Sequence, residues 1–170
     1  SVLAVASLAL AGQPKDVTLL FTNDFHSAIE PVPAYWLPGS PRLGGAAELA
    51  TVVRSVRERE PGAFLFDTGD MFTGTLSFLT RGKVLVELMN AMGYDAFAIG
   101  NHEFDYGAVN CERQMNLAGF PTLGANIYHR GTRHRFSRPW AIVEKNGVRV
   151  GVIGVIGLDA RSVALPAGIV

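Results

Sequence analysis

The stretch that decides the fold is Gly100-Asn101-His102-Glu103-Phe104-Asp105, which follows a short apolar run over residues 96–99. The apolar run predicts a buried strand. Gly100 then permits a sharp turn, because glycine has no side chain to clash with the backbone. We therefore expect one loop at the end of a strand to present an amide, an imidazole and a carboxylate.

Two earlier strands are followed by polar clusters of the same kind. Asn23-Asp24-Phe25-His26 comes after the apolar run 17–22, and Asp67-Thr68-Gly69-Asp70 comes after the apolar run 63–66. Open α/β sheets bind their ligands beyond the carboxyl ends of the strands. The three clusters are therefore predicted to form one shared site.

The order of the predicted elements indicates an α/β fold with a mixed sheet. Apolar residues recur at helical spacing over 46–60 and 83–92, between the predicted strands. Asn146-Gly147 lies between two apolar runs, 140–144 and 148–156, and predicts a β-hairpin. A strand–helix–strand–helix–strand order followed by a hairpin is typical of this class.

Three details of this fold are predicted from local patterns. The unbroken apolar run 17–21 favours a central strand that is covered on both faces. Residues 31–45 are rich in proline and glycine and predict a surface loop, which we expect Tyr35 and Trp36 to anchor. The charges of the 46–60 helix, including Arg57, are expected on its solvated face.

Composition excludes several classes of protein. The chain has 170 residues, enough for one domain with a core, and its formal net charge is zero. A neutral chain gives no electrostatic reason to bind nucleic acid or an anionic membrane. Cys111 is the only cysteine, so an internal disulfide is excluded and no role is assigned to it.

The two ends indicate a piece of a secreted protein. Residues 2–11 are apolar and small, and they end in Ala9-Leu10-Ala11, as a secretory signal does before its cleavage site. We expect residues 1–12 to be a signal remnant and the protein to be extracytoplasmic; an N-terminal helix packed on the domain is the alternative. A run of about 10 residues is too short to span a bilayer. The end at Ile169-Val170, shortly after an apolar strand, indicates the front part of a longer protein.

The polar clusters contain ligands for divalent metals. Asp24 and His26 are two residues apart, so in an extended segment both project to the same side. Mixed oxygen and nitrogen ligands suit zinc, manganese or iron. Asp70 follows a glycine and is free to bridge two ions, whereas Asp67 is either a ligand or an acceptor of loop N–H groups. Asn101 offers a neutral carbonyl oxygen.

Together these ligands predict a hydrolytic centre with two metal ions, which orients a phosphate and activates a water. His102 lies beside Asn101, where an imidazolium can stabilise charge on a phosphoryl oxygen or help a leaving group depart. Asp105 is placed to orient it. The alternative for His102 is a core-facing histidine with one hydrogen bond, and Glu103 is interpreted as structural.

Four motifs resemble those of a known family: Thr22-Asn23-Asp24-Phe25-His26, Gly44-Gly45-Ala46-Ala47, Asp67-Thr68-Gly69-Asp70 and Gly100-Asn101-His102-Glu103-Phe104-Asp105. In this order, over residues 17–157, they resemble the calcineurin-like metallophosphoesterases. More narrowly, they resemble the secreted 5′-nucleotidase family, which includes UDP-sugar hydrolases. The resemblance implies a four-layer sandwich of two mixed sheets flanked by helices, truncated in this chain.

The resemblance also implies roles for six residues. Asp24 and His26 would bind the first of two divalent ions such as zinc or manganese. Asp70 would bridge the two ions, and Asn101 would bind the second. His102 and Asp105 would match the catalytic histidine and its partner.

After residue 105 the chain departs from the family pattern. The family adds further histidines, including a Gly-His-x-His motif, and a C-terminal domain that binds the nucleoside; neither is present. We expect residues 16–170 to be the N-terminal portion of the metallophosphoesterase domain, without its C-terminal half. The expected function is metal-dependent hydrolysis of nucleotide phosphoesters. The alternatives are a non-catalytic fragment that binds one metal or none, or action on 2′,3′-cyclic nucleotides or UDP-sugars.

Overall fold

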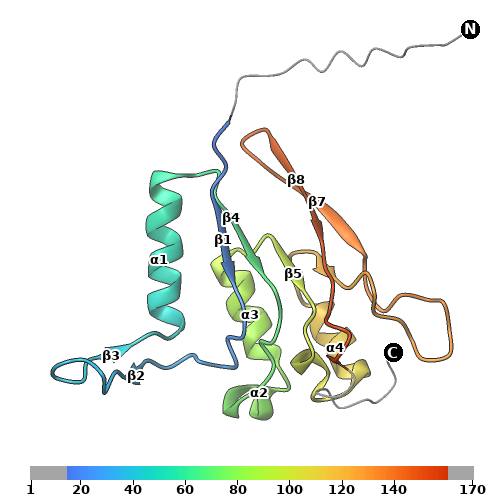
Figure 1. Ribbon diagram of the computed structural model, residues 1–170, viewed down its shortest axis with the longest axis horizontal. Helices are drawn as coiled ribbons and strands as arrows, with labels where there is room; N and C mark the ends of the chain where they lie inside the picture. The colour runs from blue at the N-terminus through green and yellow to red at the C-terminus, as the bar shows by residue number, and fades with distance from the viewer. Residues whose placement is uncertain (1–14, 161–170) are drawn as a thin grey trace, which may run out of the picture.

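The computed structural model describes residues 15–160, and a four-stranded parallel sheet forms its centre (Figure 1). The strands are β1 (Leu19–Thr22), β4 (Phe64–Asp67), β5 (Ala96–Ala98) and β6 (Thr122–Leu123), in the spatial order β1-β4-β5-β6. In this register Thr22 pairs with Asp67, and Asp67 pairs with Phe97. The first three strands therefore end at the same edge, and the loops after them meet there.

Four α-helices and one short 3₁₀-helix connect the strands of the described residues. They are α1 (Ala46–Arg59), α2 (Thr75–Thr80), α3 (Lys83–Met92), η1 (His102–Phe104) and α4 (Ala108–Met115). The predictions of α1 and α3 from helical spacing are confirmed. Helix α2 was not predicted, because its six residues include the exposed Phe78 and Leu79 and show no buried stripe.

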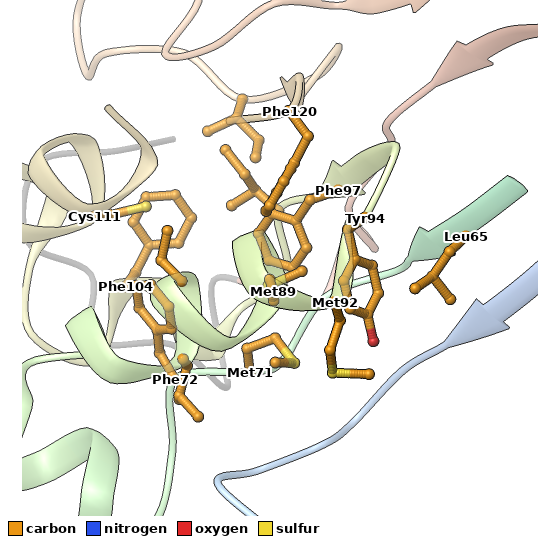
Figure 2. Packing of buried hydrophobic residues seen from close by; sticks show 14 of the residues in the cluster. Leu65, Met71, Phe72, Met89, Met92, Tyr94, Phe97, Phe104, Cys111 and Phe120 are labelled. Atoms are coloured by element: carbon orange, nitrogen blue, oxygen red, sulfur yellow. The ribbon is translucent and has the colours of Figure 1, made fainter. Parts of the chain in front are cut away.

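The main core lies between the helices and one face of the sheet. Its sheet side includes Leu65, Phe97 and Ile99, and its helix side includes Leu85 and Met89 of α3. Figure 2 shows this cluster continuing to further buried side chains of the loops and of α4, namely Met71, Phe72, Phe104 and Cys111. The loops after β4 and β5 are thus fixed by apolar side chains next to their polar ones.

A β-hairpin packs on the other face of the sheet. Its strands, β7 (Trp140–Lys145) and β8 (Val148–Ile153), pair antiparallel. Asn146 and Gly147 turn between them with φ of 48° and 70°, which confirms the predicted hairpin. A second cluster joins Ala141 of β7 to Ala96 and Leu123 of the sheet. The described residues therefore form helix, parallel-sheet and antiparallel-sheet layers, and the α/β class is confirmed.

The prediction that the first strand is covered on both faces is wrong. Within residues 15–160, β4 is the only sheet neighbour of β1, so β1 is an edge strand. The side chains of Leu19 and Phe21 are 50% and 72% exposed. The hairpin layer packs beside Phe66 and does not extend over Phe21.

The expected anchoring role of Tyr35 and Trp36 is also wrong. Both side chains are exposed, on a short hairpin formed by β2 (Val32–Pro33) and β3 (Arg42–Leu43). Ala34 anchors this hairpin instead, because it is fully buried and its N–H donates to the Pro41 carbonyl at 2.8 Å.

Arg57 does not lie on a solvated helix face. Its guanidinium donates to the carbonyls of Met92 and Gly93, both at 2.7 Å, and lies 3.4 Å from Asp95 Oδ2. Lys145 of the hairpin reaches the same Oδ2 at 2.6 Å. One aspartate thus joins α1, the sheet and the hairpin, a long-range arrangement that helical spacing does not reveal.

None of the helices in the described part of the chain is long and apolar enough to cross a bilayer. The expected signal remnant, residues 1–12, lies outside the described residues.

Candidate metal centre

The loop after β1 carries Asp24 and His26 and is bonded to the loop after β4. The Asp24 N–H donates to the Gly69 carbonyl at 3.0 Å, and the His26 N–H donates to the Asp70 carbonyl at 3.1 Å. Asp24 and His26 have φ of 51° and 48°, so the expectation of an extended segment is wrong. Asp24 Oδ1 nevertheless lies 3.6 Å from His26 Nε2.

Asp67, at the end of β4, accepts loop hydrogen bonds. Its Oδ1 accepts from the Gly69 N–H at 2.8 Å, and its Oδ2 accepts from the Thr22 hydroxyl at 2.5 Å. Burial raises the pKa of Asp67 to about 6, and the negative charges of Asp24 and Asp70 add to the rise, against these two hydrogen bonds. Asp67 was predicted to be either a metal ligand or an acceptor of hydrogen bonds from loop N–H groups, and this geometry favours the second role.

The loop after β5 lies directly against Asp70. Asp70 Oδ1 accepts from the His102 N–H at 2.9 Å. The Asn101 amide fits its neighbours when its nitrogen faces Asp70 Oδ2 at 3.2 Å and its oxygen faces the His102 N–H at 3.3 Å. His102 Nδ1 lies 2.8 Å from Asp105 Oδ2, so the aspartate fixes the orientation of the imidazole ring.

Potential ligand atoms from three loops come together at this edge of the sheet. One ligand atom each of His26, Asp70 and His102 lies within 4.8 Å of the others, and this is the one such group of three among residues 15–160. The two imidazole rings meet edge to face, with centroids 4.9 Å apart. Two imidazoles and a carboxylate suit zinc, manganese or iron, so the donor set fits a divalent metal.

The structure brings the six predicted site residues to one place. His102 joins the three-residue group, although no ligand role was predicted for it. Asp24 contacts His26 from outside that group, and Asn101 contacts Asp70. Asp105 lies behind His102, as expected.

Two buried polar residues support the site: Tyr94 was not singled out from the sequence, and Glu103 was interpreted as structural but without its partners. The Tyr94 hydroxyl lies 2.8 Å from Thr22 Oγ1, and the Thr22 hydroxyl donates to Asp67 Oδ2. Glu103 is fully buried, and its pKa is raised to about 7 by burial, against backbone N–H groups that lower it. A glutamate in a polar loop gives no sequence signal that it points inward.

These loops lie at the carboxyl edge of a parallel sheet, in the part of the chain that matches a known protein family. The family model of the calcineurin-like phosphoesterases matches residues 17–163, and the chain belongs to this family. Its relatives include 5′-nucleotidase from Bos taurus, 37% identical over 157 residues, and snake venom 5′-nucleotidase from Gloydius brevicauda, 35% identical over 157 residues. These alignments cover 89% and 88% of this chain, and 27% of each relative.

The fold agrees with this assignment. The crystal structure of a 5′-nucleotidase precursor from Thermus thermophilus superposes with a TM-score of 0.81 at 34% identity. The match covers 90% of this chain and 31% of that one. The chain thus spans about a quarter to a third of the length of these relatives.

Proposed function

We propose that this chain carries the metal-binding loops of a hydrolase that cleaves phosphate esters of nucleotides. The observation that carries the proposal is the convergence of His26, Asp70 and His102 at the carboxyl edge of the sheet. Nucleotides are proposed as substrates because the relatives named above are 5′-nucleotidases. An extracytoplasmic location is proposed from residues 2–11, and the venom origin of one relative agrees with it.

The proposed ligands are Asp24, His26, Asp70 and Asn101, around two divalent ions such as zinc or manganese. Asp24 and His26 would hold one ion, and the 3.6 Å approach of their side chains supports this pairing. Asp70 would bridge, since its backbone carbonyl binds the loop of His26 while its carboxylate contacts the loop of Asn101. When bound, divalent ions orient a phosphate and lower the pKa of a bound water to make a nucleophile.

His102 is proposed to act on the phosphate ester. Asp105 Oδ2 lies against Nδ1 of its ring, which leaves Nε2 free, and Nε2 donates a hydrogen bond when the ring is an imidazolium. As an imidazolium, His102 would stabilise negative charge on a phosphoryl oxygen or protonate the leaving group. His102 also belongs to the group of three potential ligands and could bind a metal ion there. The experiment below separates the catalytic role from the ligand role.

The test measures metal content and hydrolysis on one sample. The chain is incubated with Mn²⁺ and Zn²⁺, bound metal is counted by elemental analysis, and phosphate release from AMP is assayed. His26→Ala and Asp70→Asn should lower metal content, whereas His102→Ala should lower phosphate release more than metal content. His134→Ala is the matched control, because His134 is an exposed histidine outside the group and should leave both readouts unchanged. Unchanged phosphate release in His102→Ala would refute its catalytic role.

A second candidate is a non-catalytic chain that binds one metal. It is favoured because histidine, cysteine, aspartate and glutamate side chains form one group of three potential ligands in the described part of the chain. One bound equivalent without phosphate release would support this candidate, and two equivalents with release would exclude it. Comparison of AMP with a 2′,3′-cyclic nucleotide and a UDP-sugar would identify the ester that is cleaved.

A further inference from the structure

Glu103 is a carboxylate buried without a cationic partner. None of its surface is exposed, and no lysine, arginine or histidine within residues 15–160 forms an ion pair with it. A buried ionisable group is costly unless hydrogen bonds satisfy it. Its partners therefore indicate what its burial achieves.

The two oxygens of Glu103 accept hydrogen bonds from both loops, the one after β4 and the one after β5. Oε2 accepts from the N–H groups of Gly100 at 2.7 Å and of Asp70 at 3.0 Å. Oε1 accepts from the N–H groups of Met71 at 2.8 Å and of Phe72 at 3.3 Å. The Glu103 side chain therefore joins the loop after β4, which carries Asp70, to its own loop after β5.

The two loops are also in direct contact beside this carboxylate. A methyl group on Gly100 would lie 2.4 Å from Asp70 Oδ1 and 3.0 Å from Glu103 Oε2. Asp70 Oδ1 in turn accepts the His102 N–H at 2.9 Å. The position of Asp70 relative to His102 therefore depends on how closely these loops are held.

We propose that Glu103 is a positioning residue for the metal centre, whose carboxylate holds the backbone of Asp70 against the loop that carries His102. This inference rests on the proposed function, because it assigns Glu103 a part in metal binding. Glutamine in its place would present one acceptor oxygen and an NH₂ group, and the NH₂ group would face N–H donors that it cannot accept. The ligand atoms would then lose their fixed spacing, although no ligand is changed.

The first measurement is Mn²⁺ affinity by calorimetry. Outer-shell partners of metal sites typically change affinity about 10–100-fold when they are substituted, and Glu103→Gln should weaken Mn²⁺ binding by about that factor. Val53→Ala is the control, because Val53 is buried in α1, a helix that carries none of the proposed ligands, and its loss weakens the core. It should leave Mn²⁺ affinity within about twofold at a temperature where both variants are folded.

The second measurement is amide hydrogen exchange by NMR, which needs no metal. In Glu103→Gln the amides of Asp70, Met71 and Gly100 should exchange faster than in the wild type. The Leu65 amide, which donates to Asp95 at 2.8 Å, should not change. Glu103→Asp, which keeps the charge on a shorter side chain, should be intermediate and serves if the glutamine variant does not fold.

The outcomes separate this inference from the proposed function. Unchanged exchange at these amides would overturn the inference, and so would faster exchange with unchanged Mn²⁺ affinity. If the wild type binds no Mn²⁺, the proposed function fails and the role of Glu103 in metal binding fails with it. The exchange data would still show whether Glu103 holds the two loops together.

Discussion

Gly69 lies where two loops of the candidate metal centre touch, and replacing it by alanine tests how rigid that contact is. Its φ is +108°, and a Cβ there would lie 2.6 Å from the Gly100 nitrogen and 2.7 Å from the Gly100 Cα. Positive-φ strain costs about 1–3 kcal/mol for a residue other than glycine. Overpacking adds about 1–3 kcal/mol, because the atoms in the way are backbone and have no other rotamer. Gly69→Ala should therefore lower the free energy of unfolding by about 2–6 kcal/mol.

Gly107→Ala is the matched control for the strain contribution. Gly107 also has a positive φ, +84°, but a Cβ there would have no heavy atom within 4 Å. This variant should lose only about 1–3 kcal/mol. Urea denaturation followed by circular dichroism gives both values, provided that the slope m is unchanged. Equal losses in the two variants would refute the reasoning, since the Gly100 backbone would then have moved aside without cost.

Two further predictions concern residues outside the ligand set. Asp95→Ala should lower the free energy of unfolding by about 3 kcal/mol in thermal melts, because it leaves Arg57 and Lys145 without their shared partner. Glu87→Ala, which breaks an exposed pair with Lys83, should change it by less than about 0.5 kcal/mol, and similar losses in both variants would contradict this prediction. Burial raises the pKa of Tyr94 from 10.0 to about 12, so the native state keeps a proton that the unfolded state loses. Stability should therefore fall by about 2–3 kcal/mol as the pH rises from 10 to 12, and Tyr94→Phe should remove this fall in denaturation curves while Tyr35→Phe does not.

Much of the fold can be predicted from local patterns in the sequence. Helical spacing predicted α1 and α3 with nearly correct ends, and Asn146-Gly147 predicted the β7–β8 hairpin. These features depend on residues close together in the chain, so local physics determines them. Polar clusters after three apolar strands likewise indicated a common site, because parallel strands end at one edge.

Contacts between distant residues decided the remainder. The left-handed conformations of Asp24 and His26 arise where their N–H groups bond to the next loop, and no pattern near residue 24 encodes that loop. Arg57 is an internal ion-pair partner because folding places Asp95, 38 residues later in the chain, beside α1.

For the candidate metal centre, the sequence by itself determined which kinds of potential ligand are available and on which strand ends they lie. Only the tertiary structure decided that His102 joins His26 and Asp70 within 4.8 Å, and that Glu103 turns inward to bind the Asp70 loop. Strand register and loop contact set these distances. Both are fixed by contacts between segments that lie 30 or more residues apart in the chain, such as the hydrogen bond between Asp70 and Glu103. The residues on either side of a ligand do not determine them.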